Sequence, residues 1–269
     1  MTGHSSGTPR LVAAVAAAAV AALTATLLGL TQLELVNPSL AVRAAAVAVS
    51  ALLAFVSTTL GAVAAWRRRR DAALHERVSF VLRSVAYTVQ DLTDLDTREL
   101  GLALYLLRAD RWPPGAALAN LLGALLPGRR ADRLRLVRVV RERASRRPTA
   151  SGVIWRPGKG VIGLCVSTGE VVGQDVAALT GAWRAVPRER WQTVPESVRD
   201  GFTWGEFRSL AGKYGSVLAA PLIQDAATGS EVIGCVSLDG PDSSFGLLWT
   251  PDVRSALAQA ADTLRVLVL

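Results

Sequence analysis

The chain of 269 residues is long enough for one or two domains, and half of its residues are apolar, more than an ordinary soluble protein carries. Its net charge of +8 is uneven: residues 67–147 hold 18 Arg and 9 acidic residues, whereas residues 148–269 hold 10 basic and 12 acidic ones. A basic excess beside apolar segments indicates membrane topology rather than nucleic-acid binding. Cys165 and Cys235 lie in apolar runs without a CxxC partner, which argues against a disulfide framework or zinc site and favours buried thiols in a reducing compartment.

Two uncharged runs follow a polar tail, residues 1–10, which we expect to be disordered. Residues 11–30 and 44–66 are each long enough to cross a hydrocarbon core of about 30 Å as a helix. Trp66 and the basic cluster after it predict a membrane interface, with both termini on the cytoplasmic side of the inner (plasma) membrane. This cluster consists of Arg67, Arg68, Arg69 and Arg70. A cleaved signal peptide is the alternative for the first run.

The segment after the basic cluster, residues 71–93, has apolar residues at helical spacing and ends in acidic residues. This stripe consists of Leu74, Val78, Val81, Leu82, Val85 and Val89. The helix continues from the second apolar run, so it serves either as a signalling or dimerisation stalk or as a helix packed on its own domain's sheet. Strands are predicted at residues 99–107 and 134–140, on either side of an insertion rich in proline and glycine at residues 111–127.

A glycine-rich stretch then joins a short strand, residues 153–155, to a short helix that ends at Thr168-Gly169. Gly160 and Gly163 lack side chains where this helix begins, which permits close approach of a strand or ligand. Residues 170–175 form a short polar strand or turn.

The remaining chain predicts a helix at residues 198–210 and a strand pair at 216–222 and 232–238, joined by a turn at 224–230. Pro251, after Thr250 as N-cap, begins a terminal helix.

In this order, the motifs resemble a GAF domain, the small-ligand sensory fold related to PAS, over residues 71–269. The resemblance is to membrane-anchored bacterial GAF-domain proteins of the actinobacterial type. It rests on Gly158, Gly160, Gly163, Thr168-Gly169-Glu170, Asp175, Ser216–Pro221, Val232-Ile233-Gly234 and Leu238-Asp239. It implies an α+β domain with an antiparallel sheet of five or six strands, flanking helices and a ligand cavity. The two-helix transmembrane hairpin would precede this domain.

The chemistry of the family's specialised members is missing from this sequence. The cyclic-nucleotide signature is absent, neither cysteine is followed by the histidine of bilin-binding members, and the only histidines are His4 and His75. Cys165 lies in a segment comparable to one in free methionine sulfoxide reductases, but their Cys-Asp step is missing. We therefore expect no catalytic activity and no metal site, and the cofactor stays unknown.

Aromatic and small polar residues of the GAF-like segment are the candidate ligand-binding residues. They are Trp155, Cys165, Trp204, Tyr214, Ser216 and Ser237. Such a lining suits a small aromatic or nucleotide ligand. Two alternatives stay open: tryptophans could fill the cavity of a ligand-free interaction or dimerisation scaffold, or the hairpin could oligomerise as a ligand-triggered membrane effector. The expected partners are anionic lipid headgroups, a second copy in a homodimer and an unknown small ligand, without nucleic acid.

Overall fold

The computed structural model of the chain describes residues 40–109, 134–145, 152–226 and 229–269. The chain divides into two compact units, Met1–Ala72 and Ala73–Leu269. The second unit has the predicted α+β architecture, because its helices flank a single five-stranded antiparallel sheet.

The sheet has the strand order β2-β1-β5-β4-β3, and every neighbouring pair is antiparallel. In chain order the strands are β1 (Gly101–Ala109), β2 (Leu134–Arg143), β3 (Val172–Asp175), β4 (Ser216–Ala226) and β5 (Gly229–Gly240). Successive side chains of a strand point to opposite faces. Both faces of the central strands are covered, so β5 is buried without interruption from Gly234 to Gly240.

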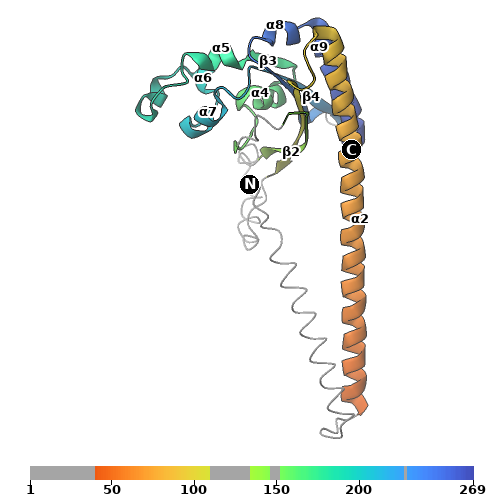
Figure 1. Ribbon diagram of the computed structural model, residues 1–269. Coiled ribbons are helices and arrows are strands. Elements are labelled where there is room, and N and C mark those ends of the chain that lie inside the picture. The colour runs from red at the N-terminus through yellow and green to blue at the C-terminus, as the bar shows by residue number, and fades with distance from the viewer. Residues whose placement is uncertain (1–39, 110–133, 146–151, 227–228) are drawn as a thin grey trace. The chain divides into compact units, whose positions relative to one another are not determined.

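One face of the sheet is covered by the C-terminal part of α2 (Leu40–Thr93) and by α9 (Pro251–Val268), as Figure 1 shows. α2 includes the helix predicted at residues 71–93, and the apolar stripe of this segment faces the core. α9 begins as predicted: Thr250 is its N-cap and accepts a hydrogen bond from the Val253 N–H at 3.4 Å, and Pro251 follows in the first turn.

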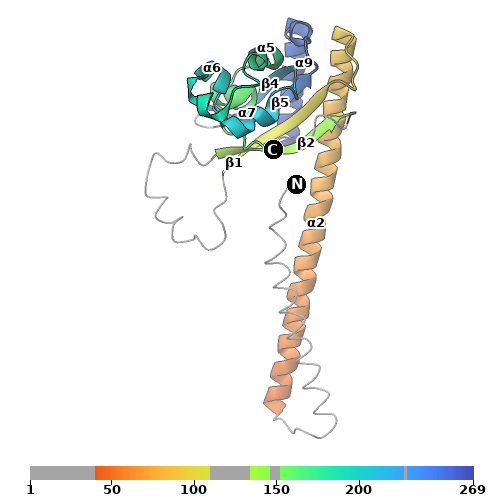
Figure 2. The ribbon, with the colours of Figure 1, turned by 60° about the vertical axis from the view of Figure 1, so that its left-hand side comes forward.

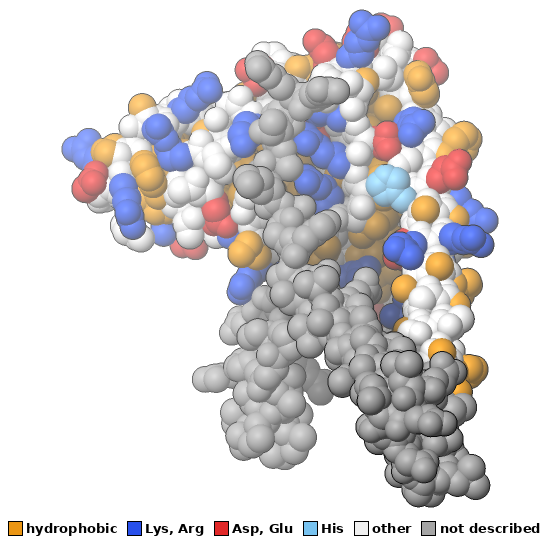
Figure 3. Space-filling view, turned by 60° about the horizontal axis from the view of Figure 1, so that its bottom comes forward, with side chains coloured by type: hydrophobic (Ala, Val, Ile, Leu, Met, Phe, Trp, Pro, Cys, Tyr) orange, Lys and Arg blue, Asp and Glu red, His pale blue; other side chains and the backbone are white. Residues whose placement is uncertain are grey.

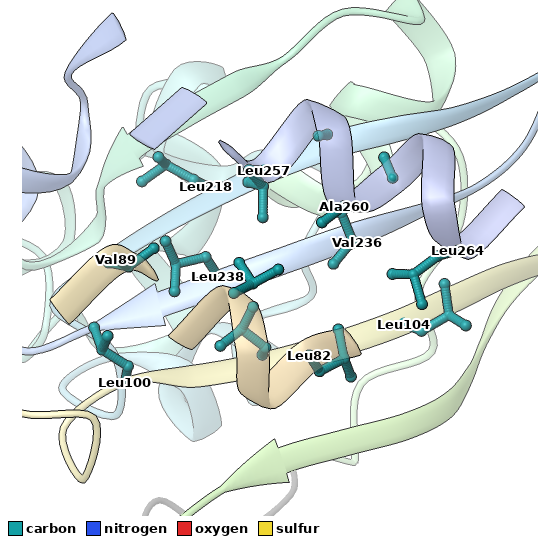
Figure 4. Packing of buried hydrophobic residues seen from close by; sticks show 14 of the residues in the cluster. Leu82, Val89, Leu100, Leu104, Leu218, Val236, Leu238, Leu257, Ala260 and Leu264 are labelled. Atoms are coloured by element: carbon teal, nitrogen blue, oxygen red, sulfur yellow. The ribbon is translucent and has the colours of Figure 1, made fainter. Parts of the chain in front are cut away.

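Leucine and valine side chains from α2, α9 and the sheet interlock in this core (Figure 4). The labelled members are Leu82, Val89, Leu100, Leu104, Leu218, Val236, Leu238, Leu257, Ala260 and Leu264. Each is less than 5% exposed. Full burial of one such Leu or Val side chain contributes about 1.5–3 kcal/mol, so this cluster is the main source of the second unit's stability.

The opposite face of the sheet carries α4 (Gly160–Thr168), whose apolar side packs on β4 and β5. The chain after β3 runs through α5 (Val176–Gly181), the 3-10 helix η2 (Arg188–Thr193), α6 (Glu196–Arg199) and α7 (Trp204–Leu210). Figure 2 shows α5, α6 and α7 grouped on this side of the sheet. They share a small core of their own around Trp191 and Phe207, whose rings lie 4.9 Å apart.

The pairing of β2 with β1 contains a bulge at Val139. The partner in β2 changes from Val140 to Arg138 between consecutive residues of β1, so Val139 has no partner. Regular alternation would place Arg138 and Arg141 on opposite faces of the sheet. The bulge instead places Arg138, Arg141 and Arg143 on the same face as α4.

Two predicted elements differ from the structure. The strand expected at residues 153–155 is reduced to a single bridge between Trp155 and Leu136. The helix expected at residues 198–210 is two short helices, because Asp200 and the glycine after it adopt left-handed conformations that end α6.

The strand pair β4–β5 is longer than predicted. Pairing continues to Ala226 and Gly229, so the connection is shorter than the turn expected at residues 224–230. The insertion predicted at residues 111–127 lies outside the described residues.

A membrane-spanning helix needs about 20 consecutive apolar residues. Among the helices that the structure describes, none is long and apolar enough to cross a membrane. The predicted hairpin of two spanning helices is therefore not supported. Its first span, residues 11–30, lies outside the described residues, and its second, residues 44–66, falls within α2.

Candidate functional site

A pocket with a volume of about 70 Å³ lies between the sheet, the N-terminal end of α4 and the segment that carries α5, α6 and α7. Its apolar lining is Ala103, Trp155, Gly160, Val161, Ile162, Val176, Leu179, Val198, Phe202, Phe207, Leu210 and Val217. Its polar lining is Tyr105, Arg138, Arg141, Gln174, Thr180, Asp200, Tyr214, Ser237 and Asp239. An apolar wall with a few convergent polar groups is typical of small-molecule sites.

The floor of the pocket is built by three cross-strand rows on one face of the sheet. Tyr105 of β1 lies opposite Arg138 of β2, and Ala103 lies opposite Ser237 of β5. In the third row, Asp239 of β5 lies beside the glycine that begins β1. Lys and Arg side chains also gather on the surface beside the projecting segment of α5 to α7 (Figure 3).

An ion pair between Arg143 and Asp239 closes one end of this floor, and both side chains are almost fully buried. It passes directly over Gly101, where a side-chain carbon would lie 2.6 Å from Arg143 Nε. Because Gly101 has no side chain, Arg143 of β2 and Asp239 of β5 can contact each other across β1.

Aromatic rings form the opposite wall. Trp155 contacts both Tyr105 and Phe202 edge to face, at centroid distances of 6.4 and 5.7 Å. A side chain at Gly160 would meet the rings of Phe202 and Trp155 at 2.7 and 3.0 Å, and Gly160 has a positive φ of 60°. Gly160 thus permits a close approach, but of two aromatic rings and not of the strand or ligand that was expected.

An ion pair joins the loop before α4 to α7. Lys159 Nζ lies 2.8 and 2.9 Å from the two carboxylate oxygens of Glu206. Glu206 also accepts a hydrogen bond from the N–H of Thr203, whose hydroxyl in turn accepts one from the Glu206 N–H. This capping box fixes the start of α7, and the ion pair with Lys159 joins that helix to the loop before α4.

Burial changes the protonation equilibria of the pocket. It raises the pKa of the Tyr105 and Tyr214 hydroxyls, so both remain protonated at neutral pH and can donate hydrogen bonds. Burial also raises the pKa of Asp200. The pKa of Asp239 is raised by burial as well, against the opposing effect of the guanidinium groups on β2.

Three of the six predicted ligand residues, Trp155, Tyr214 and Ser237, line the pocket. Cys165 lies in the packed cluster between α4 and the sheet. The Trp204 indole N–H donates to the Val186 carbonyl at 3.0 Å, within the separate core of α5 to α7. These placements do not test ligand binding, which stays a prediction for these residues.

Ser216, the remaining predicted residue, is fully buried at the start of β4. Its hydroxyl lies 3.1 Å from the Ser244 hydroxyl, near α8 (Phe245–Leu248), and it does not line the pocket.

Cys165 and Cys235, 70 positions apart in the sequence, meet beneath the pocket as free, buried thiols. Burial, together with the Cys165 thiol, raises the pKa of Cys235 well above its ordinary value. Because the thiolate is the reactive form, Cys235 is a poor nucleophile in this state. Within the described part of the chain, no three His, Cys, Asp or Glu side chains come close enough to hold a metal ion.

Sequence reasoning missed the charged residues of the pocket: Arg138, Arg141, Asp200 and Asp239. The arginines belong to a strongly basic segment that was interpreted as membrane-facing. A strand with arginines at both even and odd positions was the available signal, because such a strand places them on one face only if it contains a bulge.

No protein-family model matches the chain, and no curated protein matches it. The GAF domain of a phosphoenolpyruvate-protein phosphotransferase from Acinetobacter is similar in structure, with 14% identity and a TM-score of 0.35 over 76% of this chain and 92% of that one. A reductase structure from Staphylococcus aureus, fRMsr in its reduced form, has 13% identity and a TM-score of 0.36 over 71% and 95%. The free methionine-R-sulfoxide reductase of Neisseria meningitidis has 14% identity and a TM-score of 0.31 over 74% and 90%.

The expectation that the chain has no catalytic activity is corrected by these structures. Two of them are reductases, so an absence of enzyme activity does not follow from the fold. The similarity does not bear on membrane anchoring or on an actinobacterial source. It is a similarity at low sequence identity to structures that include a GAF domain.

Proposed function

We propose that the chain is a sensory or regulatory module that binds a small ligand in the pocket between β1, β5, α4 and α7. The observation that carries this proposal is the pocket itself. It combines apolar walls with two tyrosine hydroxyls, two guanidinium groups and a serine hydroxyl that converge on one volume. Such polar groups can hydrogen-bond to a ligand, and the apolar walls can bury the rest of it.

The lining of the pocket limits the chemistry of the ligand. Apolar walls with a few hydroxyl and guanidinium groups suit a small molecule that has both apolar and polar parts.

The sheet offers a physical connection from the pocket to α2. Along β1, Tyr105 faces the pocket, whereas the residue before it, Leu104, faces the core that contains Leu82 and Val89 of α2. A ligand that moves β1 would therefore repack α2. Such a ligand shifts the protein between two states only by as much as its contacts differ between them.

The first test is native mass spectrometry of the full-length chain, followed by a thermal-shift screen of small metabolites. A co-purifying small mass, or a ligand that raises the melting temperature, is expected. Ser237→Leu should abolish either signal, because the added carbons project into the pocket floor. Ser197→Leu, on the exposed side of α6, is the matched control and should retain it. No bound mass and no stabilising compound, with Ser237→Leu indistinguishable from the parent chain, would reject ligand binding.

Attachment to a membrane and homodimerisation are further parts of the proposal, and they rest mainly on the sequence. Trp66 and the four arginines after it are exposed on α2. Phe80 and Tyr87, also on α2, are 74% and 63% exposed and lie seven residues apart, which places them on one helix side. Flotation with vesicles that contain or lack anionic lipid, and sedimentation equilibrium of Phe80→Ser, test the two parts separately. Equal binding to both vesicles, or an unchanged mass, would reject the respective part.

A further inference from the structure

Residues 176–215, which carry α5, η2, α6 and α7, form one wall of the pocket and are packed as a body of their own. We call them the covering segment. Their small core consists of Trp191, Val194, Val198 and Phe207, all of which belong to this segment. Three side chains of the segment also donate to its own carbonyl groups, each at 3.0 Å: Arg199 to Val194, Trp204 to Val186 and Arg208 to Arg184.

Both ends of the covering segment leave the sheet at the same place. β3 ends at Asp175, β4 begins at Ser216, and these two residues are paired with each other. Directly beside this pair, the Ala177 N–H donates to the Gly215 carbonyl at 2.8 Å. A segment whose two ends lie side by side can rotate about them without stretching the chain, and small changes of the backbone angles there are enough.

A second set of contacts joins the covering segment to the loop before α4. Lys159 and Glu206 form the ion pair described above, with side chains that are only 14% and 19% exposed. The Gly160 N–H donates to the Asp200 carbonyl at 3.0 Å, and the Phe202 ring centroid lies 5.8 Å from Lys159 Nζ. These contacts are few and local, so breaking them costs less free energy than unfolding the core of the segment or of the sheet.

The floor of the pocket is nearly closed to solvent. Ser237 of β5 and Ala103 of β1 lie opposite each other and line the pocket, yet each is only 4% exposed. A ligand that contacts this floor is therefore largely enclosed. Its entry and release require a part of the wall to move.

We propose that residues 176–215 are a hinged lid, which rotates as one body about the Asp175–Ser216 pair and is latched by the ion pair between Lys159 and Glu206. This inference rests on the proposed function and adds control of entry to it. The latch determines how often the floor of the pocket is exposed, and so it determines how fast a ligand is exchanged.

The test measures how fast iodoacetamide reacts with a thiol that Ser237→Cys introduces on the floor of the pocket in the full-length chain. Tandem mass spectrometry separates this thiol from the native Cys165 and Cys235, which are fully buried between α4 and the sheet. The introduced thiol is expected to react faster than either, because lid opening requires less free energy than unfolding of the whole unit. Ala103→Cys is a second probe of the same floor, and circular dichroism shows whether each variant folds.

Glu206→Gln in the Ser237→Cys background removes the latch, and it should raise the rate by about five- to thirtyfold. Glutamine can still accept the hydrogen bond from the Thr203 N–H, so the capping box of α7 is retained. Lys159→Gln should have the same effect. Glu196→Gln is the matched control, because it removes the same charge from α6, where the side chain is 90% exposed, and should leave the rate unchanged.

A thiol introduced by Val194→Cys, in the core of the covering segment, shows whether the lid moves as one body. It should react as slowly as the native cysteines, and a rate equal to that of the thiol on the floor would overturn the lid, since the segment would then unfold instead of rotating. A thiol on the floor that reacts only as fast as the native cysteines would also overturn it. An unchanged rate in Glu206→Gln would overturn the latch. The absence of any bound mass or stabilising compound would reject the proposed function, whereas the labelling rates would still decide whether the covering segment opens.

Discussion

Single glycines decide how closely the segments around the pocket approach one another. At Gly163 the backbone of α4 lies against the loop before it, and its N–H donates to the Lys159 carbonyl at 3.0 Å. A side-chain carbon at this position would overlap the Arg156 carbonyl oxygen, which belongs to backbone and cannot rotate away. The loop before α4 therefore depends on the absence of one carbon atom.

Gly163→Ala is expected to lower the free energy of unfolding by about 2 kcal/mol or more, because either the helix or the loop must move. Gly205→Ala in α7 is the control: nothing lies within 4 Å of the added carbon. Alanine has the higher helix propensity, so this variant should be neutral or more stable by up to about 1 kcal/mol. Urea unfolding of both variants measures the difference, and equal midpoints would contradict the proposed overlap.

Residue-level reasoning from the sequence succeeded where a local signal exists. The glycine positions of α4 and the Thr250-Pro251 start of α9 were predictable, because each depends on neighbours in the chain. Trp204 does not line the pocket, and this could not be foreseen because a tryptophan's partners cannot be inferred from its type. The carbonyl of Val186, which its indole N–H reaches, lies 18 residues earlier in the chain.

At the scale of elements, an ion pair between Lys159 and Glu206 joins α7 to the loop before α4. Burial raises the pKa of Glu206, but hydrogen bonds from Lys159 and Thr203 outweigh this effect and lower it overall. A carboxyl group whose pKa is lowered by folding stabilises the protein above its unfolded pKa. This stability is lost as the pH falls through the lower, folded value.

Glu206→Gln is therefore expected to lower the free energy of unfolding at pH 7 by about 1–2 kcal/mol. The gap between parent and variant should shrink as the pH falls below 4.5, the ordinary pKa of the group. Urea unfolding between pH 7 and pH 3 measures this gap. Glu196→Gln is the control, because the Glu196 side chain is 90% exposed and its removal should change little. A constant gap over the whole range would contradict the assigned role of the ion pair.

The same scale shows where sequence patterns fail. Apolar periodicity predicted the helix at residues 71–93 and most strands correctly, because burial imposes that periodicity. The bulge at Val139 left no such trace, since an extra residue is detectable only against the partner strand. The pocket arginines were missed for this reason, although their strand was predicted.

At the scale of the molecule, the second unit contains its own core. The most deeply buried apolar residues of α2 are Val78, Leu82, Val85 and Val89. All four lie after Ala73, the first residue of the second unit. Their burial contributes roughly 6–12 kcal/mol in total at about 1.5–3 kcal/mol each. The net stability of a domain is about 5–15 kcal/mol, so the sheet cannot dispense with this helix.

A chain that begins at Ala73 is expected to unfold cooperatively, with the same urea midpoint as this unit in the full-length chain. A chain that begins at Leu95 lacks the four core residues and should not fold. Circular dichroism during urea titration distinguishes the two. Native-like unfolding of the shorter chain, or failure of the longer one to fold, would contradict the division into units.

The four arginines of β2 also affect how the sheet behaves toward foreign strands. β2 is the outermost strand of the described sheet on its side, and beyond the bridge from Leu136 to Trp155 its hydrogen-bonding edge has no described strand beside it. Such edges recruit strands from other molecules and begin aggregation. An incoming copy of β2 would be repelled by the like charges of the arginines. The bulge would also put it out of register. Arg138 and Arg141, which line the pocket, would thus also protect the concentrated protein from edge-to-edge aggregation.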